Sequence, residues 1–264
     1  MAAVASRRVA ADGSPYPDRE RPGFEREVRA MFTHIAARYD GFDHLASLGN
    51  DFLWRPRALW DLERFHADAP VLRILDVGCG TGDLTVLGAR RFPRAEVLGA
   101  DFTHAMLERA TVRTRHDAVA PRARYAAASA MHLPFADGSF DVAMSAFVAR
   151  NLPGLPEAFR ELRRVLAPTG TLMTLEITEP TSPVFRSVFH AYFDRVVPWL
   201  GVAFHSAGPY RYLPESLRYL PSRDGMIRLL QEAGFPRVEA RAQSMGIVTT
   251  YLAGAPLLPG PRHR

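Results

Sequence analysis

The sequence has one cysteine, no lysine and no long apolar run. Its single cysteine, Cys79, excludes an internal disulfide framework and argues against a cysteine-rich metal site. No apolar run reaches the roughly 18–20 uncharged residues that a membrane-spanning helix needs. Arg7 and Arg8 near the N-terminus precede no apolar segment, so a secretion signal is not expected. We therefore expect a cytoplasmic protein without a metal ion.

The basic residues are all arginine. The chain has 33 of them against 28 acidic residues, which gives a formal charge of +5. Such a charge is typical of proteins that bind nucleic acid or an anionic membrane surface. The arginines are scattered, however, and a basic stripe with interleaved aromatic residues is missing. We expect no nucleic-acid partner, whereas peripheral contact with a membrane and a homodimer stay open.

The length of 264 residues fits one large α/β domain with an insertion. Residues 1–23 are rich in glycine and proline, which predicts a flexible leader, and residues 256–264 are expected to form a frayed tail. The domain between them, 24–255, begins with a helix over 24–39 whose apolar residues share one face. This stripe would either pack on the domain or rest on anionic lipid, and we favour packing.

Strands and helices alternate after residue 70. The strands are predicted from short apolar runs rich in β-branched residues, and the helices from apolar residues at helical spacing. Strands are expected at 71–77, 96–102, 124–129, 140–147, 171–177, 236–243 and 246–253, and helices at 84–91, 104–116, 155–166 and 224–233. The alternation predicts a doubly wound, mostly parallel sheet, with its last two strands forming an antiparallel hairpin.

Three glycines stand between the first strand and the helix that follows it. Gly78, Gly80 and Gly82 have the spacing GxGxG, and glycine there allows a tight turn and a close approach of a ligand to the backbone. A dinucleotide fingerprint would need GxGxxG. Asp76 and Asp83 bracket the loop, and they would repel a pyrophosphate, which prefers bare amides at a helix N-terminus. The loop is better suited to a cation such as a sulfonium with its α-ammonium group.

Asp101 ends the second strand, 19 residues beyond Gly82, where its carboxylate can accept hydrogen bonds from ribose hydroxyls. Together with the acidic glycine loop, it indicates S-adenosylmethionine rather than a nicotinamide cofactor. The alternative is a purely structural loop, in which the glycines form a turn and Asp83 caps the helix. Cys79 is interpreted as a packed loop residue, because no neighbouring pattern marks it as a nucleophile.

Motifs along most of the chain resemble one family. The glycine loop is shared by class I methyltransferases generally, whereas several other segments are more specific. The matching segments are ILDVGCGTGDLT at 74–85, ADF at 100–102, LPFADGSFD at 133–141, RN at 150–151, RVLAPTGTLMTLE at 164–176, MFTHIAARYDGFDHLASLG at 31–49, WRPRAL at 54–59, YRYLPESL at 210–217 and GIVTTYLAG at 246–254. From about residue 28 to 253, the chain resembles the ubiquinone/menaquinone C-methyltransferases of the UbiE/MenG type.

The resemblance implies the Rossmann-like α/β fold of class I methyltransferases, with a seven-stranded sheet. It also implies an N-terminal helical lid at 24–66 and a helical insertion on the substrate side at 183–220. The implied cofactor is S-adenosylmethionine. Taken together with the glycine loop, the expected cofactor-binding residues are Asp76, Gly78, Gly80, Thr81, Gly82, Asp83, Asp101, Phe102, Ser129, Ala130, Ser145 and Ala146.

The chain departs from the family's pattern in three places. Ser129 is shorter than the acid or amide that usually contacts the adenine in this family, VARN at 148–151 replaces GLRN, and Asp43 replaces an asparagine. Cofactor binding is expected to survive these changes, so their effect is expected on the choice of acceptor.

The reaction implied by the resemblance transfers a methyl group from S-adenosylmethionine to a ring carbon of a prenylated quinol. Demethylmenaquinol is the first acceptor, and a 2-methoxy-6-polyprenyl-1,4-benzoquinol is the second. The alternatives are methylation of another small molecule or of a phospholipid amine, and a non-catalytic subunit that binds S-adenosylmethionine. Methyl transfer of this kind requires no Lewis acid.

Arg150 and Asn151 follow the fourth strand, at the open edge of the sheet above the cofactor. A fixed cation at Arg150 would lower the pKa of the acceptor's phenol and hold the phenolate, although a structural arginine is the alternative. Asn151 would orient the substrate or cap a turn. Tyr39, at the end of the N-terminal helix, is a further catalytic candidate, and core packing is its alternative.

The substrate pocket is expected to include Asp40, Tyr210 and Tyr212. The aromatic residues of the insertion would give a polyprenyl tail a place to lie, although an ordinary helical core would use the same residues. Several histidines are candidate proton acceptors, but a lone histidine is more often structural, and none is singled out.

Overall fold

The computed structural model describes residues 23–36, 47, 49–66, 70–180, 182–192, 216–217 and 219–254. The predicted tail, almost all of the predicted leader and most of the insertion lie outside these residues. The candidate residues Tyr39, Asp40, Tyr210 and Tyr212 lie outside them as well.

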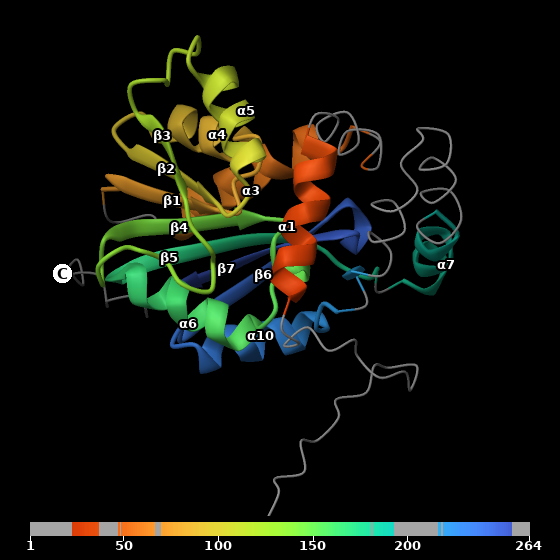
Figure 1. The fold of residues 1–264 in the computed structure, drawn as a ribbon. Helices are drawn as coiled ribbons and strands as arrows, with labels where there is room; N and C mark the ends of the chain where they lie inside the picture. Colours follow the sequence, from red (N-terminus) through yellow and green to blue (C-terminus); the bar gives the residue numbers. More distant parts are fainter. Residues whose placement is uncertain are drawn as a thin grey trace, which may run out of the picture.

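Seven strands form one sheet in the order β3-β2-β1-β4-β5-β7-β6 (Figure 1). Neighbouring strands from β3 to β5 are parallel, and β7 is antiparallel to both β5 and β6. The strands are β1 (Arg73–Val77), β2 (Glu96–Asp101), β3 (Ala123–Ala127), β4 (Phe140–Ala146), β5 (Leu166–Ile177), β6 (Arg237–Gln243) and β7 (Val248–Gly254). The predicted seven-stranded α/β fold with a C-terminal antiparallel hairpin is confirmed.

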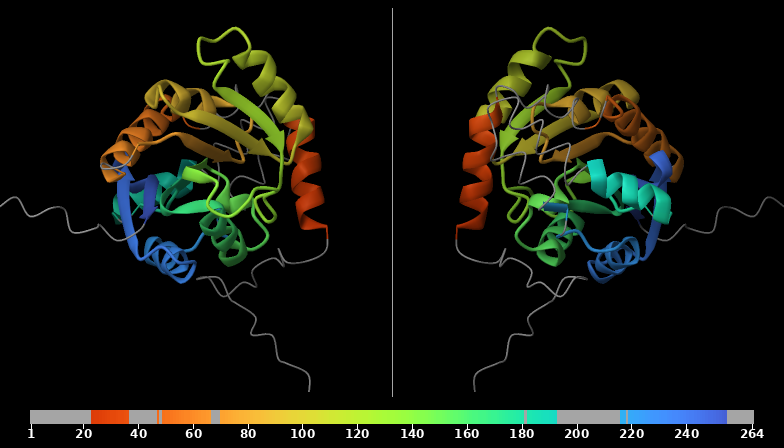
Figure 2. Two further views of the ribbon diagram at one scale, coloured as in Figure 1. Left: turned by 90° about the vertical axis from the view of Figure 1, so that its left-hand side faces the viewer. Right: turned by 90° about the vertical axis from the view of Figure 1, so that its right-hand side faces the viewer.

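Helices cover both faces of the sheet (Figures 1 and 2). One face carries α3, α4 and α5, and the other carries α6 and α10. The helices are α1 (Phe24–Ile35), α3 (Asp51–Phe65), α4 (Asp83–Arg91), α5 (His104–Thr114), α6 (Leu155–Val165), α7 (Pro183–Ala191) and α10 (Arg223–Glu232), with short 3-10 turns η2 (Ala149–Asn151) and η4 (Ser244–Gly246). No helix in the described part of the chain is long and apolar enough to cross a membrane.

The apolar runs of the strands follow from this layering. Successive side chains of a strand point to opposite faces, so Ile74 joins the core under α3 and α4, while Leu75 joins the core under α6 and α10. Both side chains are fully buried. Burial of a leucine or isoleucine side chain contributes about 1.5–3 kcal/mol to folding. A sheet covered on both faces therefore uses nearly continuous apolar strands.

One strand is longer than the sequence pattern predicts. β5 begins at Leu166 instead of residue 171 and follows α6 directly. Leu166 pairs with Phe140 of β4, and the register then shifts before Val142 pairs with Thr171. Pro168 and Gly170 lie within this irregular stretch. They interrupt the apolar pattern, so the pattern did not predict a strand there.

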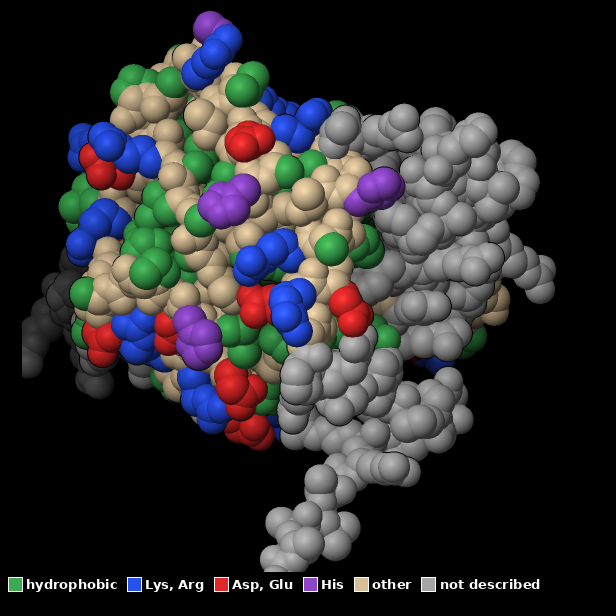
Figure 3. Space-filling model, in the orientation of Figure 1, with side chains coloured by type: hydrophobic (Ala, Val, Ile, Leu, Met, Phe, Trp, Pro, Cys, Tyr) green, Lys and Arg blue, Asp and Glu red, His purple; other side chains and the backbone are tan. Residues whose placement is uncertain are grey.

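Helix α1 runs beside the carboxyl ends of the parallel strands (Figure 1). Its residues Phe24 and Val28 are buried, and Phe32 lines a cavity at this edge. The predicted apolar stripe therefore faces the domain over the described part of the helix. Acidic and basic side chains are interspersed over the described surface facing the viewer in Figure 3.

Candidate active site

Two adjoining cavities open at the carboxyl edge of the sheet. They lie where the strand order reverses between β1 and β4, which is the usual ligand site of open α/β sheets. The larger cavity has about 670 Å³ of free space, including its open mouth, and the smaller has about 340 Å³. Gly78, Gly80 and Ala146 line both cavities, so a single extended ligand can occupy the two.

The glycine loop has a backbone that only glycine adopts easily. The φ angles of Gly78, Gly80 and Gly82 are 67°, 54° and 88°. A Cβ on Gly82 would lie 2.5 Å from the hydroxyl of Tyr125, and one on Gly78 would lie 2.5 Å from a methyl group of Val148. A Cβ on Gly80 would meet nothing within 4 Å, because this residue borders the open cavity. The loop thus combines a tight turn with a bare backbone facing the ligand space.

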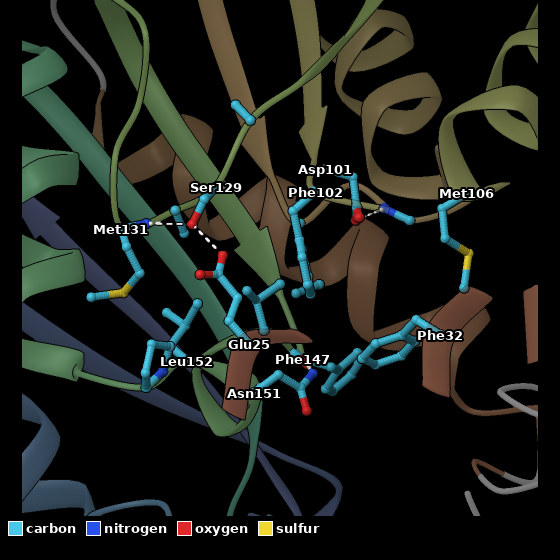
Figure 4. Close-up of a pocket in the computed structure, with 17 residues that line it drawn as sticks. Glu25, Phe32, Asp101, Phe102, Met106, Ser129, Met131, Phe147, Asn151 and Leu152 are labelled. Atoms are coloured by element: carbon cyan, nitrogen blue, oxygen red, sulfur yellow. Dashed lines mark hydrogen bonds between the residues drawn. The ribbon is translucent and has the colours of Figure 1, made fainter. Parts of the chain in front are cut away.

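Asp101 holds this loop in place from the end of β2. Its Oδ2 accepts a hydrogen bond from the backbone N–H of Gly80 at 3.0 Å, and its Oδ1 accepts one from Thr103 at 2.8 Å. Burial raises the pKa of the Asp101 carboxyl, and the backbone hydrogen bonds oppose that rise. The side chain lines the larger cavity (Figure 4), where it offers a fixed acceptor for hydroxyl groups.

The smaller cavity contains charges of both signs. The buried Asp76 lines this cavity and accepts a hydrogen bond from Thr85 Oγ1 at 2.6 Å. Asp83 also lines this cavity and forms an ion pair with Arg113 at 2.5 Å. Arg55 of α3 faces them and pairs with Asp51 of its own helix at 3.1 Å. A cavity with buried carboxylates and a guanidinium suits a zwitterionic group better than a phosphate.

Asp76→Asn is expected to flatten the pH dependence of stability in the cofactor-free protein. Burial raises the pKa of Asp76 from 3.8 to about 7, so between these values the folded protein holds a proton that the unfolded chain has released. The free energy of unfolding therefore falls as pH rises through this window, on the order of a few kcal/mol. Asparagine keeps an acceptor for Thr85 but does not ionise, so the stability of the variant relative to the wild type rises between about pH 4 and pH 7 and stays constant above that.

Thermal unfolding from about pH 4 to pH 8 measures this effect. Glu157→Gln is the matched control, because Glu157 is exposed and pairs with Arg160 on the surface. If the melting temperatures of wild type and Asp76→Asn differed by the same amount at every pH in this range, the prediction would be contradicted.

The predicted cofactor residues after β3 and at the end of β4 do not all face the cavities. Ser129 and Ala130 line the larger cavity, and Ala146 lines both. Ser145 is instead buried, and its hydroxyl donates a hydrogen bond to Oγ1 of Thr174, its partner on the neighbouring strand β5, at 3.0 Å. Ser145 and Gly82 are the two predicted cofactor residues that line neither cavity. Gly82 acts through the shape of the loop.

The two candidate residues after β4 also differ. Asn151 lines the larger cavity, and its Nδ2 donates a hydrogen bond to the carbonyl of Phe147 at 3.2 Å. Arg150 is buried in η2 and lines neither cavity among the described residues. Its guanidinium lies against the ring of Phe147, 5.9 Å from the ring centre, and that ring lines the larger cavity.

The helices before β1 contribute residues that the sequence reasoning missed. Glu25 and Phe32 of α1 line the larger cavity, and Arg55 of α3 lines the smaller one. Arg55 falls within the motif WRPRAL, which marked the resemblance but carried no role. No local pattern connects these residues with the glycine loop, because tertiary packing alone brings the helices to it. Within the described ranges, no group of three or more His, Cys, Asp or Glu residues could hold a metal ion.

The strand order, the glycine loop after β1 and the acidic residue ending β2 define a class I methyltransferase, a class that uses S-adenosylmethionine. Solved structures agree on the fold. A SAM-dependent methyltransferase from Thermotoga maritima has a TM-score of 0.60 at 16% identity, covering 87% of this chain and 100% of that chain. A phosphoethanolamine N-methyltransferase of Haemonchus contortus, solved with S-adenosylhomocysteine, has a TM-score of 0.56 at 18% identity, over 76% and 53% of the two chains.

The chain belongs to the ubiE/COQ5 methyltransferase family, which it matches over residues 22–254. It is 40% identical to a demethylmenaquinone methyltransferase of Thermus thermophilus, over 86% of this chain and 100% of that protein. It is 37% identical to a ubiquinone/menaquinone biosynthesis C-methyltransferase UbiE of a Geobacter species, over 85% and 94% of the two chains. The family predicted from the sequence motifs is confirmed, as are its enzyme class and its cofactor.

Proposed function

We propose that the protein transfers the methyl group of S-adenosylmethionine to a ring carbon of a prenylated quinol, with demethylmenaquinol as the first acceptor. The observation that carries the proposal is the 40% identity to a demethylmenaquinone methyltransferase over that protein's full length. The apolar character of the larger cavity supports it, because Phe32, Met106, Phe147 and Leu152 are among the residues that line it.

The cofactor is proposed to span both cavities. Asp101 would accept hydrogen bonds from the ribose hydroxyls, next to the open face of Gly80. The methionine end would occupy the smaller cavity, with its ammonium group near Asp76 and its carboxylate near Arg55. This arrangement places opposite charges together and leaves the apolar part of the larger cavity for the acceptor.

Bound S-adenosylmethionine supplies an electrophilic methyl group on its sulfonium. The chain's own task is to hold the acceptor's ring carbon in line with that methyl and to stabilise the phenolate that makes the carbon nucleophilic. Arg150 is proposed to stabilise the phenolate, and Asn151 to orient the quinol through its side-chain amide. A carbon–methyl bond would form as the sulfur–methyl bond breaks, which leaves S-adenosylhomocysteine, and the ring carbon would then lose its proton to water at the open mouth of the cavity.

Mass spectrometry tests the reaction. The purified protein is incubated with S-adenosylmethionine and a chemically reduced, short-chain demethylnaphthoquinol, and a product heavier by one methylene is expected. A benzoquinol acceptor and phosphoethanolamine, tested in parallel, distinguish the two quinol classes and an amine methyltransferase. Confirmed binding of S-adenosylhomocysteine without methylation of either quinol would contradict the proposal.

Prenylated quinols dissolve in the membrane, so the proposal includes contact with a membrane surface. Phe52 and Leu53 at the start of α3 and Met245 in η4 expose apolar side chains. The hydrogen bond from Trp54 Nε1 to Ser244 Oγ, 2.8 Å long, brings these two segments together. Flotation with anionic vesicles tests this contact, and protein that fails to float with them would remove this part of the proposal.

A further inference from the structure

The larger cavity is lined by a second acidic residue besides Asp101. Glu25, in the first turn of α1, lines the cavity, and its Oε1 accepts a hydrogen bond from Ser129 Oγ at 2.6 Å (Figure 4). The two residues are 104 positions apart in the sequence. Phe24 and Val28 are buried and fix the helix against the domain, and the hydrogen bond from Ser129 fixes the carboxylate itself.

The hydroxyl of Ser129 is already committed. It donates its hydrogen to Glu25 and accepts a hydrogen bond from the backbone N–H of Met131 at 3.2 Å. Serine is also shorter than an acid or amide, so its oxygen stays close to the backbone. Next to Ser129, the strongest acceptor is therefore the carboxylate of Glu25, which lines the cavity and can be approached by a ligand amine.

Glu25 and Asp101 line the same cavity from two different elements, α1 and the end of β2. Asp101 is suited to the ribose hydroxyls, Phe102 provides an aromatic face beside it, and Ser129 and Glu25 lie farther along the same cavity (Figure 4). Adenine has one exocyclic amine, which donates hydrogen bonds and pairs well with a carboxylate acceptor. We infer that Glu25 of α1 recognises the adenine amine of S-adenosylmethionine, in the role for which Ser129 is too short.

This assignment makes α1 part of the cofactor site. The helix contributes its carboxylate from outside the sheet, so binding of the cofactor also holds the helix in place. The inference depends on the cofactor alone and is independent of which acceptor the protein methylates.

The test compares two ligands that differ at one group. Binding of S-adenosylhomocysteine and of S-inosylhomocysteine, in which a carbonyl replaces the amine, is measured by calorimetry on the full chain. Glu25→Ala is expected to weaken S-adenosylhomocysteine binding about 10-fold and to leave S-inosylhomocysteine binding unchanged or stronger. Glu27→Ala is the matched control, because Glu27 lies in the same first turn and is exposed.

Two further variants complete the test. Glu25→Met removes the acceptor while keeping the length of the side chain, and it replaces the alanine variant if that does not fold. Adding Ser129→Asp to Glu25→Ala is expected to restore the preference for adenine. An equal loss of affinity for both ligands would mean that Glu25 only fastens α1 to the domain, and this result, like no loss at all, would overturn the inference.

Discussion

Arg150→Ala is expected to lower turnover about 100- to 1,000-fold while leaving the affinity for S-adenosylhomocysteine nearly unchanged. The phenolate form of the acceptor carries the electron density that attacks the methyl group. A buried guanidinium stabilises such a charge more strongly than water does, and removing one such group from an active site costs about 3–4 kcal/mol of transition-state stabilisation. Arg150 is buried against Phe147, whose ring lines the cavity, so its charge acts through little solvent.

The pH profile separates this role from a structural one. If Arg150 lowers the pKa of the bound phenol, the rate of the alanine variant continues to rise with pH after the wild-type rate has levelled off. Arg150→Lys keeps the charge and is expected to recover part of the rate. Arg160→Ala, on the exposed side of α6, is the control. A rate loss with an unchanged pH profile, or one that follows a loss of cofactor binding, would contradict the assignment.

Asp101→Ala is expected to weaken the binding of S-adenosylhomocysteine about 10- to 100-fold. A hydrogen bond to a charged acceptor contributes about 1.5–3 kcal/mol, and each 1.4 kcal/mol corresponds to a factor of about 10 in affinity. The structure adds a second contribution, because the same carboxylate holds the backbone of Gly80 and Thr103. Part of the loss is therefore expected from a looser glycine loop.

Calorimetry of wild type, Asp101→Ala and Asp101→Asn measures the effect. Asparagine retains one oxygen that can accept from the backbone but loses the charge, so an intermediate affinity is expected. The thermal unfolding of each variant shows whether the fold is intact. A folded alanine variant that binds with the wild-type dissociation constant would refute the role of Asp101.

Two departures from the family's pattern have local structural explanations. Val148 stands where the family has glycine, and its side chain occupies the space that Gly78 leaves by lacking a Cβ. Ser129 is hydrogen-bonded to Glu25, which brings a carboxylate next to it in the cavity lining. Both departures lie in the lining of the larger cavity, and neither disturbs the backbone of the glycine loop.

The sequence alone determined the fold class, the glycine loop and the family. Each of these depends on residues that are close together in the chain. Apolar alternation predicted the strands, and the spacing of Gly78, Gly80 and Gly82 predicted the turn that their positive φ angles now confirm. Asp101 was found in the same way, because a residue that ends a predicted parallel strand must lie at the carboxyl edge of the sheet.

Only the tertiary structure decided which side chains face the ligand space. Ser145 and Ala146 are neighbours on β4, and the twofold periodicity of a strand sends one toward Thr174 and the other into the cavities. The sequence does not say which is which. Glu25 and Arg55 come from helices that precede the sheet in the chain, and packing of those helices brings their charges to the site. Such contacts depend on how each helix packs on the sheet, and local sequence patterns do not predict that packing.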